Sequence, residues 1–361
     1  MDLDLVLDPS THPDEVVAVC AQAERLGIRA VWASNYHQDR DPFLSLARPA
    51  LETSTLLLGV LAVSPWELHP LRMATSAMTL NELAGGRAIV AVSGGGGVLG
   101  ALGWRLGDAP ESWPPTDPVT RQRGPDRRLR GVRECLEFLL TARTGEMVMP
   151  LEGEIFQTHR PAQLDWAWPT GPAVYSCASG PRMIELGAVL ADGNQLSDFT
   201  VSEMPGAIEH VRIGNEERSA DAGPLRIGNF VAWHIKADRE ASEREARRAL
   251  IWRRSLAAQY AADLRAFCHD DAEVALVLAN YMNFLAAFWS GSGHIDGVPE
   301  DLVERLVHGM SSAGDLGDLD REIERVLAFR DAGVTELALR LGDDPLEALA
   351  IIGQHVLPAL R

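Results

Sequence analysis

The sequence predicts an α/β fold, a (β/α)8 TIM barrel that forms a single domain over residues 1–361. Two observations favour it. Short apolar runs typical of buried strands alternate with amphipathic stretches about eight times, which is the TIM-barrel pattern. Small and polar residues follow several of these runs, most clearly at Gly94–Gly97 after the run 88–92. Residues that come directly after parallel strands lie at the end of the sheet where ligands bind. A doubly wound open sheet is the alternative fold.

The first half of the chain supplies four strands with helices between them. Residues 13–26 have apolar side chains at helical spacing, and Gly27 stops the helix. Prolines at 42 and 70 each stand at the start of an expected helix, where a missing N–H costs nothing. We expect strands at 3–7, 30–34, 56–63 and 88–92, and helices at 13–26, 42–51 and 70–83.

The second half continues the alternation but contains long interruptions. A TIM barrel uses about 250 residues, which leaves roughly 110 for insertions. We assign these to a loop at about 98–130, a hairpin at about 146–160 and a helical insertion at about 238–315. The insertion should contain helices at 239–264, 272–289 and 300–310. The barrel itself should take strands at 173–177, 194–196, 225–235 and 335–341, and helices at 131–142, 182–190, 201–218, 320–331 and 345–357.

Composition excludes several classes of function. The formal net charge is −18, whereas nucleic-acid binding requires a concentrated basic surface, so we expect no nucleic-acid partner. Four scattered cysteines show neither a disulfide framework nor a metal-binding spacing, and we expect free thiols and no metal. We see no signal peptide and no apolar run long enough to span a membrane. These features predict a cytoplasmic protein with no membrane association.

Two glycine-containing turns are candidate binding loops. Gly94–Gly97 lacks the lysine of a P-loop and the spacing of a dinucleotide motif, so by itself it favours a flexible surface loop over a ligand site. Ser179-Gly180-Pro181 precedes a helix, whose first N–H groups can bind an anion. A plain helix start is the alternative for this second turn.

Seven stretches, taken together and in order, resemble a known family. They are residues 23–27, 31–34, 69–70, 83–88, 178–181, 191–193 and 328–335. The chain resembles the bacterial luciferase-like superfamily, in particular its coenzyme F420-dependent branch, which includes methylenetetrahydromethanopterin reductase. The resemblance implies a TIM barrel with a flavin or deazaflavin at its carboxyl face, and a homodimer.

The same resemblance implies which residues meet the cofactor. Asn35, Tyr36 and His37 follow the second strand, and Leu61-Ala62 matches a non-proline cis bulge that supports the deazaflavin ring in the family. The residues implied to approach the ring or the ribityl chain are Ser64, Ser93, Gly94 and Gly95, and those implied to hold the phosphate are Ala178, Ser179 and Gly180.

The sequence departs from the family pattern at two positions. Family members often have Asp-His where this chain has Asn35-Tyr36, and a related sugar-phosphate branch has glutamate where this chain has Gly96. The proton donor is therefore open, with Tyr36 and His37 as candidates. Arg340 ends the last strand, where it could hold an anion or form an ion pair.

The resemblance implies an oxidoreductase that transfers hydride from reduced coenzyme F420 to a C=C or C=N bond of a small organic substrate. An FMN-dependent luciferase-like monooxygenase is the alternative, and a non-catalytic binding protein on the same fold is a further one. The helix 70–83 has more apolar residues than one core-facing stripe requires, so we expect it at the interface of a homodimer.

Overall fold

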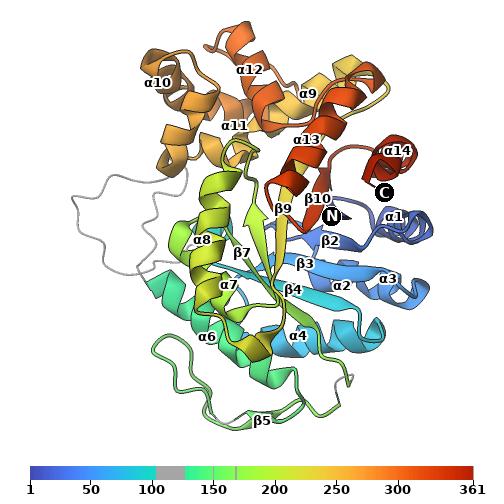
Figure 1. The fold of residues 1–361 in the computed structure, drawn as a ribbon, viewed down its shortest axis with the longest axis vertical. Helices are drawn as coiled ribbons and strands as arrows, with labels where there is room; N and C mark the ends of the chain where they lie inside the picture. Colours follow the sequence, from blue (N-terminus) through green and yellow to red (C-terminus); the bar gives the residue numbers. More distant parts are fainter. Residues whose placement is uncertain (103–126, 149, 167–168, 361) are drawn as a thin grey trace.

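The structure, a computed structural model, describes residues 1–102, 127–148, 150–166 and 169–360. Parallel strands form a closed barrel in the order β1-β10-β9-β8-β7-β4-β3-β2, which confirms the predicted TIM barrel and rules out the open sheet (Figure 1). The barrel strands are β1 (Asp2–Leu7), β2 (Ala30–Ser34), β3 (Leu57–Val63), β4 (Ala88–Ser93), β7 (Ala173–Ala178), β8 (Gly193–Ser197), β9 (Arg226–Trp233) and β10 (Glu336–Leu341).

Helices on the outside of the barrel connect the strands. Two of them, α1 (Pro13–Leu26) and α4 (Pro70–Leu83), have the predicted bounds, and Gly27 ends α1 in the left-handed conformation. The other barrel helices are α2 (Pro42–Ser45), α3 (Ala47–Glu52), α6 (Arg127–Ala142), α7 (Pro181–Leu190), α8 (Met204–Glu216), α13 (Leu319–Asp331) and α14 (Pro345–Ile351).

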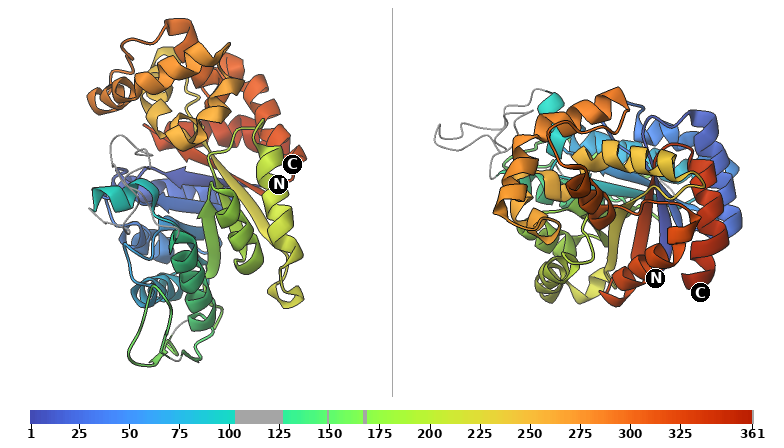
Figure 2. Two further views of the ribbon diagram at one scale, coloured as in Figure 1. Left: turned by 90° about the vertical axis from the view of Figure 1, so that its left-hand side faces the viewer. Right: turned by 90° about the horizontal axis from the view of Figure 1, so that it is seen from above.

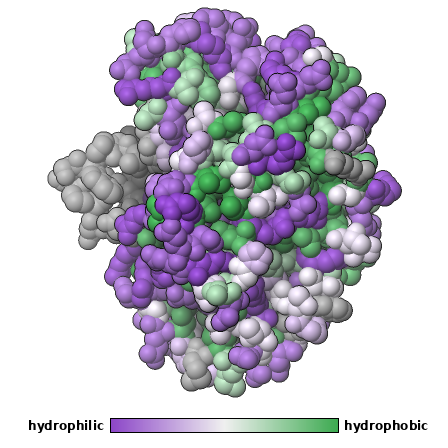
Figure 3. All heavy atoms as spheres, in the orientation of Figure 1, coloured by the Kyte–Doolittle hydropathy of each residue, from purple (hydrophilic) through white to green (hydrophobic). Residues whose placement is uncertain are grey.

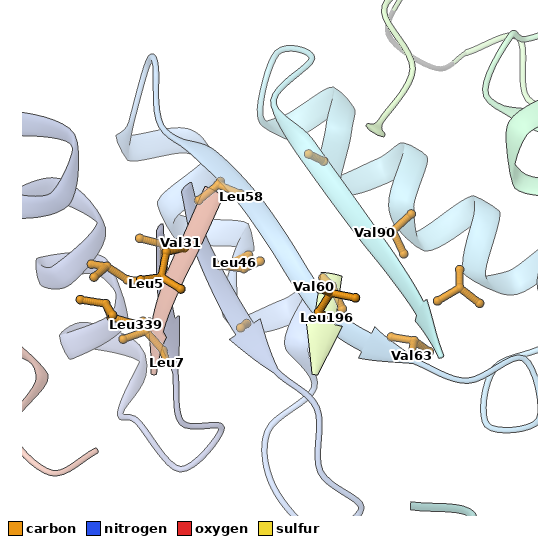
Figure 4. Packing of buried hydrophobic residues seen from close by; sticks show 14 of the residues in the cluster. Leu5, Leu7, Val31, Leu46, Leu58, Val60, Val63, Val90, Leu196 and Leu339 are labelled. Carbon is orange, nitrogen blue, oxygen red and sulfur yellow. The ribbon is translucent and has the colours of Figure 1, made fainter. Parts of the chain in front are cut away.

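Two layers of buried side chains hold the barrel together. The larger layer lies between the strands and the surrounding helices and includes Leu5, Val31, Val90 and Leu196 (Figure 4). The smaller layer fills the barrel interior and includes Trp32 and Tyr175, whose ring centroids are 5.5 Å apart. Successive residues of a strand point to opposite sides, so each strand supplies both layers.

A glycine makes room for the largest interior side chain. A Cβ atom at Gly59 would stand 2.2 Å from the ring of Trp32, so only glycine fits beside this indole. The Trp32 Nε1 donates a hydrogen bond to Asp4 Oδ2 at 2.8 Å. Asp4 in turn pairs with Arg29, which also lies 2.9 Å from Glu336 Oε2. The interior at the amino end of the barrel therefore contains a largely buried ionic network.

The helical insertion forms a cap, residues 239–310 (Figure 2). The cap has its own apolar core, which includes Leu250, Phe284 and Leu306. Its α-helices are α9 (Arg239–Ala249), α10 (Asp271–Ala279), α11 (Tyr281–Ser290) and α12 (Glu300–Met310). Figure 3 shows apolar atoms between the cap and the barrel helices and hydrophilic residues over much of the outer surface of the cap.

Several predicted boundaries were wrong. The expected helix 239–264 ends at Ala249 and gives way to short 3-10 turns over 250–266, and the expected helix 272–289 bends by 51° between α10 and α11. The expected helix 42–51 is interrupted at Leu46, and the last helix contains a π turn at Ile352–Val356. The spacing of apolar residues indicates which face of a helix is buried, but it does not show where the helix is interrupted.

The loop and the hairpin were also bounded incorrectly. Residues 98–101 belong to the helix α5 (Gly96–Ala101) and 127–130 to α6, while 103–126 lie outside the described residues. The hairpin pairs β5 (Met147–Val148) with β6 (Ala162–Gln163), so its returning strand lies beyond residue 160.

The argument for placing α4 at a dimer interface was wrong. Met73, Ala77 and Met78 are buried within the protomer, where Met73 contacts Cys135 of α6. The surplus apolar surface of α4 is therefore covered by the neighbouring helices. No single helix among the described residues is long and apolar enough to cross a membrane, although the bent pair α10–α11 together meets that criterion.

Candidate active site at the carboxyl face of the barrel

Parallel pairing gathers the strand ends on one face. Ser93 pairs with Cys177, Ser34 with Leu61, and Val63 with Val92. The residues that follow these positions therefore surround the carboxyl mouth of the barrel, as predicted. Active sites of TIM-barrel enzymes lie at this end.

The β2 and β3 ends meet at a bulge. The Leu61–Ala62 peptide bond is cis, and the register between β3 and β4 shifts between Val60 and Val63. Both Leu61 and Ala62 thus join the interior cluster of the barrel. Asn35 holds this bulge, because its N–H donates to Leu61 O at 2.9 Å and its Nδ2 to Ala62 O at 3.1 Å. The geometry agrees with the bulge that the resemblance implied.

Asn35 also bonds a carboxyl group that sequence reasoning missed. Its Nδ2 donates to Glu67 Oε2 at 2.8 Å, and burial raises the pKa of Glu67. Ser64, which is buried, lies at the start of the same turn and accepts a weak hydrogen bond from Trp66 N at 3.4 Å. The polar groups beside the bulge are thus already engaged with one another.

The two predicted proton donors have different surroundings. Tyr36 is half-buried and packs edge-on against Trp252 of the cap, at 5.4 Å between centroids. The Arg340 guanidinium lies 5.8 Å from the Tyr36 ring centroid and pairs with Asp8 at 3.2 Å, so Arg340 forms the expected ion pair. His37 is exposed, and its place in the loop offers no enclosed position for proton transfer.

The glycine turn after β4 approaches Ser64 closely. Gly95 has φ +86°, and a Cβ there would stand 2.7 Å from Ser64 Oγ. Gly94 has ordinary room around it, and Gly95 N donates a hydrogen bond to Ser93 Oγ at 3.3 Å. Ser93, Gly94 and Gly95 therefore form a narrow turn beside the β3 end.

The turn after β7 presents an uncapped helix N-terminus. Ala178 is buried at the end of the strand, while Ser179 and Gly180 are half-buried. Gly180 is the N-cap residue of α7, and no side chain caps this helix. Among the described residues, the only atom within 4 Å of a Cβ at Gly180 would be Tyr260 Oη, at 4.0 Å. Within the described part of the chain, the start of α7 is therefore uncrowded, which fits an anionic group such as a phosphate bound by its first N–H groups.

Asp198 ties the cap to the end of β8. It has φ +60°, a conformation that aspartate tolerates better than most residues. Its Oδ1 lies 3.0 Å from Arg253 Nη1, and its Oδ2 accepts from Arg254 N at 2.9 Å. Arg254 is sandwiched between the rings of Phe199 and Tyr260, at 4.1 and 4.0 Å. The segment 250–256 of the cap therefore lies across the barrel mouth.

A buried cluster at the end of β9 was missed by sequence reasoning. His234 Nδ1 lies 2.6 Å from Glu245 Oε1 of α9, and Lys236 Nζ lies 3.1 Å from Glu245 Oε2. All three residues are buried. Burial opposes the ionisation of Glu245, but His234 and Lys236 outweigh it and lower the pKa of this carboxyl. The partners lie on different elements, so their spacing in the sequence carried no signal.

Two hollows among the described residues are not lined by any of the predicted cofactor-binding residues. A cavity of about 820 Å³ opens at the amino end, where Arg29, Arg143 and Arg226 are each held by a carboxylate. A smaller one, of about 360 Å³, lies between the β8–α8 turn and α12. Within the described residues, no cluster of three or more His, Cys, Asp or Glu could hold a metal ion.

The protein is a TIM barrel, with a closed sheet of parallel strands. Its carboxyl mouth has polar turns, an uncapped helix N-terminus and a helical cap, and this is the end at which TIM-barrel enzymes have their active sites. The comparisons with known proteins identify the family. The chain belongs to the luciferase-like monooxygenase family, whose model matches residues 4–336. The resemblance seen in the sequence is thereby confirmed.

Relatives and solved structures agree with this assignment. The 5,10-methylenetetrahydromethanopterin reductase of Archaeoglobus fulgidus is 24% identical over 94% of this chain and 93% of its own length. The structure of the coenzyme F420-dependent tetrahydromethanopterin reductase from Methanopyrus kandleri covers 100% of this chain and 99% of its own, with a TM-score of 0.78 and 22% identity. An F420-dependent secondary alcohol dehydrogenase, in complex with an F420-acetone adduct, covers 100% of this chain and 99% of its own, with a TM-score of 0.70 and 17% identity.

Proposed function

We propose that the protein is an oxidoreductase that uses coenzyme F420 and transfers hydride from the reduced cofactor to a C=C or C=N bond of a small organic substrate. The observation that carries this proposal is the pairing of two features across the carboxyl mouth. Leu61 and Ala62, which both belong to the interior cluster at the end of β3, offer a support for a flat ring, and the uncapped N-terminus of α7 offers donors to a phosphate. Coenzyme F420 has both a flat ring and a phosphate, and the F420-dependent enzymes among the similar proteins support it as the cofactor.

The residues proposed to hold the cofactor come from four turns. Asn35, Leu61 and Ala62 would support the ring, and Ser64, Ser93, Gly94 and Gly95 would border it or the ribityl chain. Ala178, Ser179 and Gly180 would bind the phosphate through backbone N–H groups. When bound, reduced F420 supplies the hydride, and the protein orients the reactants and excludes water.

The cap supports the same proposal. The ring centroid of Trp252 lies 5.4 Å from that of Tyr36 and 5.1 Å from that of Phe288. Three aromatic rings in contact therefore connect the barrel with α11 of the cap. Arg253 closes the opposite side by its ion pair with Asp198. A small substrate would be enclosed between this segment and the cofactor ring, where hydride transfer is protected from water.

Equilibrium titration tests the choice of cofactor. We expect F420 to bind more tightly than FMN, measured from the change in absorbance and fluorescence of each cofactor on addition of protein. Tighter binding of FMN would favour an FMN-dependent monooxygenase. Binding of neither cofactor would favour a non-catalytic binding protein on this fold.

A further inference from the structure

His234 follows β9 directly and continues the interior side of that strand. Gly228 and Phe230 face the barrel interior, whereas Val231 and Trp233 belong to the outer layer. The backbone stays extended beyond the strand, because His234 N donates to Ser312 O at 2.7 Å. Since side chains alternate along an extended chain, His234 lies on the interior side at the carboxyl mouth.

Among the described residues, only one nitrogen of the His234 imidazole has a hydrogen-bond partner. Nδ1 lies 2.6 Å from Glu245 Oε1, whereas Nε2 is buried and has no hydrogen-bond partner among the described residues. His234 is only 5% exposed. A buried polar atom without a partner is rare in native proteins and calls for an explanation such as a catalytic role.

Glu245 is itself fixed from three directions. Its Oε2 lies 3.1 Å from Lys236 Nζ and accepts from Asp343 N at 3.0 Å, while its Oε1 contacts His234 Nδ1. A histidine whose Nδ1 is held by a buried carboxylate presents Nε2 in a fixed direction, the arrangement by which histidine exchanges protons with substrates. The carboxylate stabilises the imidazolium and does not itself take up the proton.

We propose that His234 exchanges the substrate proton that accompanies hydride transfer, and that Glu245 is its positioning residue. This inference rests on the proposed function. In the reducing direction, one atom of the C=C or C=N bond gains the hydride supplied by reduced F420. The Nε2–H bond of the His234 imidazolium then breaks and the other atom gains that proton, which leaves neutral imidazole. The oxidising direction reverses both transfers.

The other candidates at this face are less suited to the role. The Tyr36 side chain is engaged with Trp252 and Arg340, and His37 is exposed. Both oxygens of Glu67 lie within 3.1 Å of Asn35 Nδ2. His234 combines burial with an imidazole nitrogen that has no partner among the described residues, so we assign to it the role left open by the replaced Asp-His pair.

The pH dependence has a definite sign. Burial lowers the pKa of His234 from 6.5, with Arg253 of the cap and Lys236 acting in the same direction, and Glu245 of α9 acting against them. Because reduction needs the imidazolium, kcat/KM for reduction should fall as pH rises through a value below 6.5. Oxidation needs neutral imidazole, so its kcat/KM should rise through the same value.

The test compares His234→Gln and Glu245→Gln with His308→Gln. His308 is a matched control, because its Nδ1 is also buried without a partner in the described part of the chain and burial also lowers its pKa, but it lies on α12. F420 affinity is measured first by fluorescence titration. Turnover is then measured with reduced F420 and 5,10-methylenetetrahydromethanopterin as the probe.

We expect His234→Gln to lower kcat about 10²- to 10⁴-fold, the usual contribution of a proton-transferring group, with F420 affinity unchanged within about twofold. The fall of kcat/KM with rising pH should disappear in His234→Gln and move to a different pH in Glu245→Gln. His308→Gln should keep the wild-type dependence of kcat/KM on pH. A wild-type protein that binds no F420 overturns the proposed function. A His234→Gln variant that keeps the wild-type kcat and pH profile overturns this inference alone.

A second readout needs no turnover. In protein carrying ¹⁵N-labelled histidine, the signals of His234 are identified by their loss in His234→Gln. We expect protonated Nδ1 and unprotonated Nε2 at neutral pH, and a shift of the Nε2 signal when F420 saturates the protein. The opposite tautomer, or signals that do not respond to F420, would overturn the inference even if the probe is not a substrate.

Discussion

Gly342 lies directly against the carboxylate of Glu245: a Cβ atom at Gly342 would stand 2.0 Å from Glu245 Oε1. Gly342 follows β10, and Glu245 belongs to α9 of the cap. The absence of a side chain at 342 therefore lets the cap helix place its carboxylate between the β9 and β10 ends. This contact sets the position of the His234–Glu245 pair.

Gly342→Ala should lower the free energy of unfolding by about 1–3 kcal/mol, the usual cost of an extra carbon in a packed site. Urea denaturation measures it. Gly206→Ala is the control, because nothing lies within 4 Å of a Cβ at that position of α8 and alanine favours a helix. Equal stability of the two variants would show that Glu245 moves aside without cost.

Glu24→Gln should weaken the contact between α1 and the start of β3. Burial opposes the ionisation of Glu24, but the N–H groups of Thr55, Ser54 and Leu56 donate to its Oε1 and lower its pKa from 4.5 to about 2. A lowered pKa in the folded state stabilises the protein above pH 4.5, and this contribution is lost as the pH falls towards 2.

At pH 7 we therefore expect Glu24→Gln to cost about 1–2 kcal/mol, since Glu24 is partly exposed to solvent. The difference from wild type should shrink below pH 4.5. Urea denaturation over this pH range measures the difference in the free energy of unfolding. Glu82→Gln, at an exposed position, is the control. A difference that is constant with pH would contradict the assignment.

Asp198→Asn should loosen the cap. Asparagine also tolerates the left-handed conformation at this position, so the change removes mainly the charge that faces Arg253. Both side chains are buried, and an unpaired buried arginine should cost about 3 kcal/mol in the free energy of unfolding. Asp14→Asn, which breaks an exposed pair with Arg48, is the control and should have little effect. Equal effects in the two variants would argue against a buried anchor.

Gly180→Val places a branched side chain before the uncapped N-terminus of α7. The described residues leave room for it, because the nearest of their atoms to a Cβ is Tyr260 Oη at 4.0 Å. We expect the fold to be kept and the affinity for F420 to fall at least tenfold, as measured by fluorescence titration. Gly206→Val on α8 serves as control. Unchanged affinity would mean that this turn is a plain helix start.

The homodimer stays a prediction, now with a different surface. Leu44 of α2 and Leu51 of α3 are 75% and 69% exposed, and apolar surface of this kind often marks a partner site. We expect a dimer mass by light scattering at low micromolar concentration, and a monomer for Leu44→Glu. Met147→Glu changes another exposed apolar residue, on the hairpin, and should remain a dimer. A monomeric wild type would contradict the prediction.

The motifs that carried the resemblance have mostly structural roles. Glu24 bonds the start of β3, and Arg87 donates to Leu56 O and Thr53 O. Asp192 pairs with Arg143 and accepts from Val174 N at 2.8 Å. These residues fix the frame of the barrel, so the sequence could identify the fold from them while the proton-transfer group stayed open.

The sequence by itself determined the barrel, its strand order along the chain and the turns that surround its carboxyl mouth. Apolar periodicity, helix-starting prolines and Gly27 are local signals, and each acts within one element. They were sufficient to place Asn35, Ser93 and Gly180 on one face, because parallel strands must end together.

Only the tertiary structure decided what meets at that face. His234 follows β9, whereas Glu245 belongs to α9. Gly342 follows β10, nearly a hundred residues further along the chain than Glu245. The break of the expected helix 239–264 likewise falls where segment 250–256 packs over the mouth. Such contacts arise from burial and charge pairing between elements distant in the chain, and no local pattern in the sequence encodes them.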